Sequence, residues 1–262
     1  MGVGEPRRAG RRLHAAMLAV ALAVAPGPAA AQGAGGGDGR ALRVAVDVGH
    51  TLAAPGARSA RGRGEFSFNL ALADAVAQAL RDRGVVVQVV NADGGIGSLQ
   101  DRPAEAATFG ADLLLSIHHD SVGPQLLRTW EWAGRTEAYN DDYAGHSLFV
   151  SRDNPRVAES ELCARVIGAR LQRMGFVPTD KNANRPYADP ELAVHFYDGL
   201  AVLRHATMPA VLFEAGVIRN RAEELLLADA GYQARMADGI ATAVVACLRS
   251  GRPAGEAAGE AR

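Results

Sequence analysis

Short runs of valine, isoleucine, leucine and alanine alternate along the chain with longer segments that have the periodicity of helices. The apolar runs are residues 42–48, 85–90, 111–118 and 210–214. The helical segments are residues 66–83, 101–109, 159–174, 221–227 and 232–248. Such alternation predicts one α/β domain with a twisted, mostly parallel sheet and helices on both of its faces.

Side chains suited to metal binding stand where these predicted strands end. His50, His118 and Glu214 each lie at the carboxyl end of an apolar run, and Glu65 opens the first helical segment. In parallel sheets ligands bind beyond the carboxyl ends of the strands. Two histidines and a carboxylate, with one position left for water, make a catalytic zinc site. A further carboxylate can transfer a proton, and partial burial would raise the pKa of Glu214 for that role.

Each of these residues, taken alone, also has a structural interpretation. His50 is compatible with a hydrogen-bonded histidine beside a strand end. Glu65 is compatible with an acidic residue favoured by the dipole at a helix start. Glu214 is compatible with a partner for an arginine. Because no compact zinc motif such as HExxH is present, the residues alone leave both interpretations open.

Separated motifs then occur in a recognisable order. They are VDVGH at 46–50, Glu65 at a helix start, Leu99 with Arg102, SIH at 116–118, and VLFEAGVIRN at 211–220. In this order and over residues 43–248 the chain resembles the amidase-3 family, the zinc-dependent N-acetylmuramoyl-L-alanine amidases. The resemblance implies an α/β fold with a twisted sheet of about six strands.

The resemblance also implies site residues and a reaction. It places zinc ligands at His50, Glu65 and His118, and a catalytic glutamate at Glu214. It implies that zinc activates a water molecule, which attacks the lactyl carbonyl of muramic acid in peptidoglycan. The glutamate would carry the proton to the amine of L-alanine. Two alternatives are a zinc peptidase that acts on another wall amide and a non-catalytic module that binds the wall or regulates another hydrolase.

One departure from the family affects the ligand assignment. Where family members often have a small residue and asparagine after Ser-Ile-His, this chain has His119 and Asp120. Adjacent residues of a strand point to opposite faces, so His119 should not share a metal with His118. We assign the ligand to His118, and an exchange with His119 is the alternative.

The amino-terminal sequence predicts export. Residues 1–31 have an arginine-rich start, a short apolar run and small residues before Gln32, as in a signal peptide. The run is shorter than the roughly 20 residues of a membrane span, so we expect no stable insertion after its removal. We expect residues 32–40 to be a flexible linker, 41–250 the catalytic domain and 251–262 a disordered tail, with the protein in the periplasm.

Charge and composition bear on partners. The chain has a net charge of −1, and without residues 1–31, which carry four arginines and one glutamate, the net charge is −4. That balance argues against a nucleic-acid partner. We expect a monomer that binds peptidoglycan by itself or with an activator protein.

Two further features have open interpretations. Cys163 and Cys247 are able to pair in an oxidising compartment or to serve as small buried apolar side chains. Trp130 and Trp132, in the strand that follows the second histidine in the family, are suited to stacking on substrate or to packing.

Overall fold

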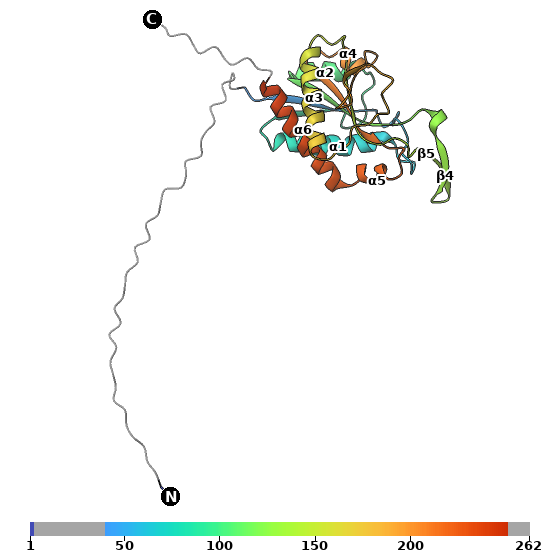
Figure 1. Cartoon of the computed structure of the whole chain (residues 1–262). Coiled ribbons are helices and arrows are strands. Elements are labelled where there is room, and N and C mark those ends of the chain that lie inside the picture. The colour runs from blue at the N-terminus through green and yellow to red at the C-terminus, as the bar shows by residue number, and fades with distance from the viewer. Residues whose placement is uncertain (3–39, 251–262) are drawn as a thin grey trace. The chain divides into compact units, whose positions relative to one another are not determined.

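A seven-stranded sheet has the strand order β2-β1-β3-β9-β6-β8-β7, and the helices labelled in Figure 1 lie around it. The computed structural model describes residues 1–2 and 40–250. Apart from residues 1–2, the predictions for the signal peptide (1–31), for linker residues 32–39 and for the tail (251–262) concern residues outside these ranges. The strands are β1 (Arg43–Val48), β2 (Val86–Val90), β3 (Leu113–Asp120), β4 (Arg128–Trp132), β5 (Arg135–Tyr139), β6 (Ser147–Val150), β7 (Tyr187–Asp189), β8 (Val194–Phe196) and β9 (Ala210–Val217).

The helices cover both faces of this sheet. They are α1 (Glu65–Arg81), α2 (Asp101–Phe109), α3 (Val157–Arg173), α4 (Ala201–Arg204), α5 (Glu223–Leu227) and α6 (Ala230–Ser250), with a short 3-10 helix at Pro124–Leu126. Every strand and helix predicted from sequence periodicity is present, with ends shifted by a few residues. The predicted α/β fold class is confirmed.

The sheet changes character at β9. Strands β2, β1, β3 and β9 are parallel, whereas β6 runs antiparallel to β9 and β7 antiparallel to β8. The sheet has seven strands rather than about six. Strands β6, β7 and β8 have only three or four residues each, too few to produce a recognisable alternation in the sequence.

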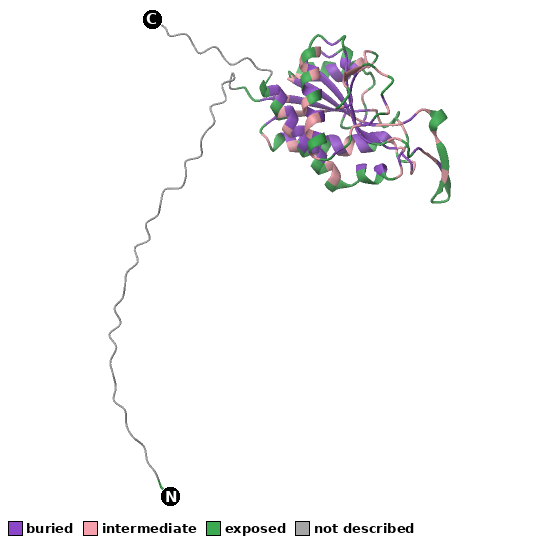
Figure 2. Ribbon diagram, viewed as in Figure 1, coloured by how far each residue is buried: buried purple, intermediate pink, exposed green. Residues whose placement is uncertain are grey.

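Alternating side chains of the strands enter two separate cores. Val44, Val46 and Val48 of β1 belong to the core that α1, α3 and α6 cover, and Ala45 belongs to the core beneath α2 and α4. The buried strands between these helices are visible in Figure 2. Because both faces are covered, the central strands are apolar along most of their length, as parallel strands usually are, and their buried polar residues lie toward the carboxyl ends.

A disulfide joins two helices of the first core. Cys163 of α3 is bonded to Cys247 of α6, with their Cα atoms 5.1 Å apart. Of the two interpretations of these cysteines, the structure shows pairing. A crosslink between residues 84 apart in sequence restricts the unfolded chain, which by a chain-entropy estimate stabilises the fold by roughly 4 to 5 kcal/mol.

Strands β4 and β5 form a separate hairpin that extends away from the sheet (Figure 1). The indole rings of Trp130 and Trp132 are stacked with centroids 5.2 Å apart, and Nε1 of Trp130 donates a hydrogen bond to the carbonyl of Ala60. Trp130 therefore fastens the hairpin to the loop between β1 and α1.

Within the described residues, no helix is both long and apolar enough to cross a membrane.

Candidate metal centre

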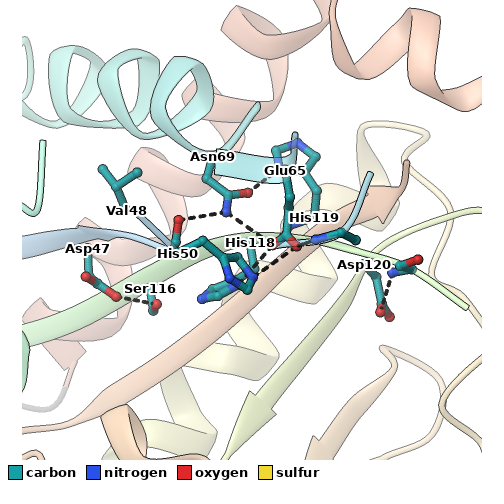
Figure 3. A network of polar contacts seen from close by, with 12 residues as sticks. Asp47, Val48, His50, Glu65, Asn69, Ser116, His118, His119 and Asp120 are labelled. Atoms are coloured by element: carbon teal, nitrogen blue, oxygen red, sulfur yellow. Dashed lines mark hydrogen bonds and ion pairs between the residues drawn. The ribbon is translucent and has the colours of Figure 1, made fainter. Parts of the chain in front are cut away.

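Three predicted ligands meet at the carboxyl-terminal edge of the sheet, where β1 and β3 end beside the first turn of α1 (Figure 3). Nε2 of His50 lies 3.0 Å from Oε2 of Glu65, and Nδ1 of His118 lies 3.1 Å from Oε1 of the same carboxylate. One ligand atom from each residue lies within 4.8 Å of the others. The parallel pairing of β1 with β3 and the start of α1 thus bring distant residues into one cluster.

Glu65 is buried and surrounded by hydrogen-bond donors. Besides both histidines, the amide of Ala57 donates to Oε2 at 3.0 Å, and Nδ2 of Asn69 donates to Oε1 at 3.2 Å. Burial opposes ionisation, but the hydrogen bonds with His118 and His50 outweigh it, so the pKa of Glu65 lies well below its usual value. Glu65 is therefore ionised at neutral pH, as a carboxylate ligand must be.

Side chains from two other segments hold the backbone of His50. Its φ of +67° lies in the left-handed region, which non-glycine residues seldom adopt. The carbonyl of His50 accepts hydrogen bonds from Nδ2 of Asn91 at 2.7 Å and from Arg102 at 2.6 Å. Arg102 also forms a buried ion pair with Asp47 at 2.6 Å. These contacts offset the backbone strain and direct the imidazole toward Glu65.

Two glycines leave the space that the ligand side chains occupy. A Cβ atom on Gly49 would lie 2.4 Å from the ring of His118. A Cβ atom on Gly56 would lie 2.5 Å from Oε2 of Glu65 and 2.6 Å from Cδ2 of His50. Any side chain at either glycine would therefore force the ligands apart.

The structure separates His118 from His119 as strand alternation predicts. The side chain of His119 is 1 % exposed, and its Nδ1 lies 2.8 Å from Oδ1 of Asn69. Nδ2 of Asn69 donates to Glu65 and to the carbonyl of Gly49, so Oδ1 is its acceptor and Nδ1 of His119 carries the proton. Burial lowers the pKa of His119 to about 3. The histidine that lies with His50 is thus His118.

Glu214 lies next to the cluster on the neighbouring strand, opposite His118 in the β3–β9 register. Its side chain is half-buried, but Oε2 is enclosed and has no hydrogen-bond partner among the described residues. Burial, followed by the negative charges of Asp120 and Glu65, raises the pKa of Glu214 well above its usual value, and the charge of Lys181 opposes the shift. The site therefore has one ionised carboxylate and one that holds a proton more readily.

A cavity of about 590 Å³ opens beside His50 and His118. Residues 51–54 and 94–99 supply most of its walls, and its volume is typical of a small-molecule site. A second cavity, of about 360 Å³, lies beside the disulfide at the opposite edge of the sheet. None of the candidate site residues lines that second cavity, so the first is the one relevant to chemistry at the cluster.

The donor set fits a divalent metal ion. Two imidazole nitrogens and one carboxylate oxygen, with room for a further ligand, are the donors of catalytic zinc sites. In His50, Glu65 and His118 these donors converge from three elements, and the adjoining glycines keep the space between them open.

Comparison with known proteins identifies the family. The sequence matches the Amidase_3 family, described as N-acetylmuramoyl-L-alanine amidase, over residues 44–246. The chain belongs to this family. It is thus a hydrolase of the N-acetylmuramoyl-L-alanine amidase class, and the resemblance seen in the motifs is confirmed.

The relatives of this Amidase_3 chain span nearly the whole described domain. This chain is 28% identical over 203 residues to the uncharacterized protein YqiI of Bacillus subtilis. The alignment covers 77% of this chain and 82% of YqiI. It is 27% identical over 217 residues to the amidase AmiA of Escherichia coli, covering 77% and 74% of the two chains. The solved catalytic domain of CwlV, an amidase from Bacillus (Paenibacillus) polymyxa, is 26% identical with a TM-score of 0.61, covering 78% of this chain and 97% of CwlV.

Several residues of this Amidase_3 chain that hydrogen-bond to the site residues were not among those predicted from the sequence. Asn69 lies one helical turn after Glu65, a spacing that places both side chains on one face of α1 and was a readable signal. Asn91 and Asp120 had no such signal, because their partners are distant in sequence. Lys181 could have been noticed from the amino-acid composition, since it is the only lysine in the chain.

Proposed function

We propose that this chain is a zinc-dependent amidase that cleaves the bond between the lactyl group of N-acetylmuramic acid and L-alanine in peptidoglycan. One observation carries the proposal. The ligand-type cluster of His50, Glu65 and His118 lies beside Glu214, whose enclosed Oε2 has no protein partner among the described residues. Membership of the Amidase_3 family supplies the substrate class.

The residues divide into holding and proton-transfer roles. His50, Glu65 and His118 would hold the ion. Zinc at this position would supply Lewis-acid polarisation of the lactyl carbonyl and activation of water near neutral pH. Glu214 would accept the proton of the attacking water and deliver it to the departing amine of L-alanine. A carboxylate whose pKa is raised toward neutrality suits both transfers.

We also propose that the protein is exported to the periplasm. Two features support this: the signal-peptide pattern of residues 1–31, and the disulfide between Cys163 and Cys247. Disulfides persist in oxidising compartments and are rare in the bacterial cytosol. Fractionation of cells that express the full chain, with a periplasmic marker enzyme, tests this proposal. Recovery of the protein only from the cytoplasmic fraction would contradict it.

We propose that the active form is a monomer, since every residue of the candidate site comes from one chain. Size-exclusion chromatography with light scattering tests this. Whether an activator protein is also required is tested by activity. A chain that requires one will bind zinc and cleave a synthetic muramoyl-dipeptide but release little alanine from whole peptidoglycan.

The decisive experiment is digestion of purified peptidoglycan by the chain beginning at Gln32. We expect new amino-terminal alanine on the released peptides while the sugar strands stay intact. A chelator should abolish this release, and added zinc should restore it. Glu214→Ala, which leaves the three ligand-type residues in place, is the matched inactive control.

The alternative functions give different products. A peptidase acting on another wall amide would release amino groups other than that of L-alanine. A non-catalytic module would bind peptidoglycan and release nothing. A zinc-loaded chain that fails to cleave both peptidoglycan and a synthetic muramoyl-dipeptide would contradict the proposed function.

A further inference from the structure

Lys181 is the only lysine among the 28 lysine and arginine residues of the chain. The two residue types are not equivalent. Lysine has a compact ammonium group, whereas arginine has a planar fork of donors that spans both oxygens of a carboxylate. Where a chain that otherwise uses arginine has one lysine, the surroundings of that lysine show whether a compact cation is needed.

Lys181 lies in the segment 178–186, which follows α3 and precedes β7. Its Nζ is 2.6 Å from Oδ1 of Asp120, the last residue of β3. The side chains of Lys181 and Asp120 are only 15% and 14% exposed, so this ion pair is largely shielded from solvent. It is therefore a stronger contact than an ordinary surface ion pair.

The other oxygen of Asp120 is already occupied. Nδ2 of Asn182 donates to Oδ2 of Asp120 at 3.0 Å and also lies 3.1 Å from Oγ of Ser147, the first residue of β6. An arginine at position 181 could reach both oxygens of Asp120 only by displacing Asn182. The geometry thus accounts for a lysine at this position.

This network surrounds Glu214. In the sheet, Glu214 is paired with His118 of β3 on one side and with Ser147 of β6 on the other. Asp120 and Ser147, which the side chains of Lys181 and Asn182 contact, therefore lie at the ends of the strands that flank Glu214. Both Asp120 and Lys181 are close enough to Glu214 for their charges to act on it.

Backbone bonds hold the segment to the domain at its two ends, and at the end before β7 the amide of Phe196 donates to the carbonyl of Pro186. The amide of His146 donates to the carbonyl of Val177, and the amide of Thr179 donates to the carbonyl of His146. The contacts to the end of β3 come from the side chains of Lys181 and Asn182. Loss of the Lys181 ammonium would thus free the part of the segment nearest Glu214.

We propose that Lys181 is a positioning residue for Glu214. Its ammonium, bound to Asp120, fixes segment 178–186 against the ends of β3 and β6. The fixed segment then holds Glu214 in the position from which it contacts the substrate. The inference rests on the proposed amidase function, since it assigns Lys181 to the proton-transfer half of that site. It concerns neither zinc binding nor the fold as a whole.

The test compares Lys181→Met and Lys181→Arg with a matched control, Arg152→Met. Arg152 also forms a 2.6 Å ion pair, with Asp198, but it follows the far end of β6, away from Glu214. For each variant we would measure kcat and KM with a synthetic muramoyl-dipeptide, the zinc Kd by chelator competition, and Tm.

Both Lys181 variants should lower kcat on the order of 10- to 100-fold, because misplacement of a catalytic group by about 1 Å can cost as much as 10²-fold. KM, zinc Kd and Tm should change little, and Arg152→Met should leave all four quantities unchanged. Asp120→Asn should reproduce the loss in kcat. The double variant of Asp120→Asn with Lys181→Met should be no worse than either single one, because both break the same contact.

Several outcomes would overturn the inference. Wild-type kcat in Lys181→Met would exclude any role, and wild-type kcat in Lys181→Arg would show that charge alone suffices. A loss in kcat matched by a loss of zinc or of thermal stability would show a general structural role; if Lys181→Met does not fold, Lys181→Arg and Asp120→Asn still decide. A zinc-loaded wild-type chain without turnover would instead contradict the proposed function, and so the two failures are distinguishable.

Discussion

Glu65 and Glu214 lie on adjacent parts of one site, yet their surroundings shift their pKa values in opposite directions. Glu65 is buried among donors, and the hydrogen bonds from His118 and His50 keep its pKa low. Oε2 of Glu214 is enclosed and has no donor among the residues that the structure describes, and this desolvation, followed by the charges of nearby acids, raises the pKa of Glu214. Environments that separate two carboxylates in this way favour one as a permanent anion and the other as a proton carrier.

The two halves of the site also differ in how they are held. The ligand half lies among parallel strands, and a buried ion pair between Arg102 and Asp47 fixes the carboxyl end of β1. The Glu214 half lies where β9 meets the antiparallel strand β6, and its outer wall is a segment attached through Lys181. This difference suggests that changes in one half should alter metal affinity, and changes in the other should alter turnover.

The largest effect should come from His118→Ala. Removal of one of three ligand-type side chains should lower zinc affinity by more than the roughly 10- to 100-fold that loss of an outer hydrogen-bond partner costs, and it should abolish amide hydrolysis. His119→Ala is the control, because His119 faces Asn69 rather than the cluster. Zinc competition assays would check both variants. Greater zinc loss in His119→Ala would show that the ligand assignment must be exchanged.

Glu214→Gln should impair proton transfer and leave the ligand half of the site intact. We expect kcat to fall by about 10²- to 10⁴-fold, the usual contribution of a general acid–base group. Zinc affinity should stay at the wild-type value, because Glu214 is not one of the three clustered residues. Turnover of a muramoyl-dipeptide and zinc titration would be measured on the same preparation. If zinc affinity falls with kcat, the two halves are not separable.

Asn69→Ala should weaken the ligand half without removing a ligand. Asn69 donates to Glu65 and accepts from His119, so its loss leaves Oε1 of Glu65 with fewer donors. We expect zinc affinity to fall by roughly 10- to 100-fold, with kcat unchanged at saturating zinc. A lower kcat at full zinc occupancy would show that Asn69 contributes to the reaction itself.

The smallest expected effect is a difference between the pH dependence of kcat/KM and that of zinc occupancy, which tests the contrast between Glu214 and Glu65. Glu214 must be deprotonated to accept a proton, and its pKa is raised above the usual 4.5, so kcat/KM should fall as pH decreases through that raised value. The acid limb should thus lie above pH 4.5. Glu65 has a lowered pKa, so protonation of this ligand should release zinc only at lower pH, and zinc occupancy would be followed in parallel. Identical pH profiles for activity and zinc occupancy would contradict this assignment.

The sequence by itself determined the fold class and the edge at which the candidate site lies. Hydrophobic periods of two and 3.6 residues are local properties, so the alternation of strands and helices could be read directly. The position of His50, His118 and Glu214 at strand ends then followed, since parallel strands bring their carboxyl ends to one edge. The same alternation within one strand separated His118 from His119.

Only the tertiary structure decided the rest. The pairing of Cys163 with Cys247, the extension of the sheet through β6, β8 and β7, and the contact of Lys181 with Asp120 all join residues far apart in sequence. Strands of three or four residues have no period to detect, and a hydrogen bond between distant loops depends on how both are packed. Packing of the whole domain therefore determined the surroundings of Glu214, whereas local sequence pattern indicated Glu214 itself and most of the ligand half.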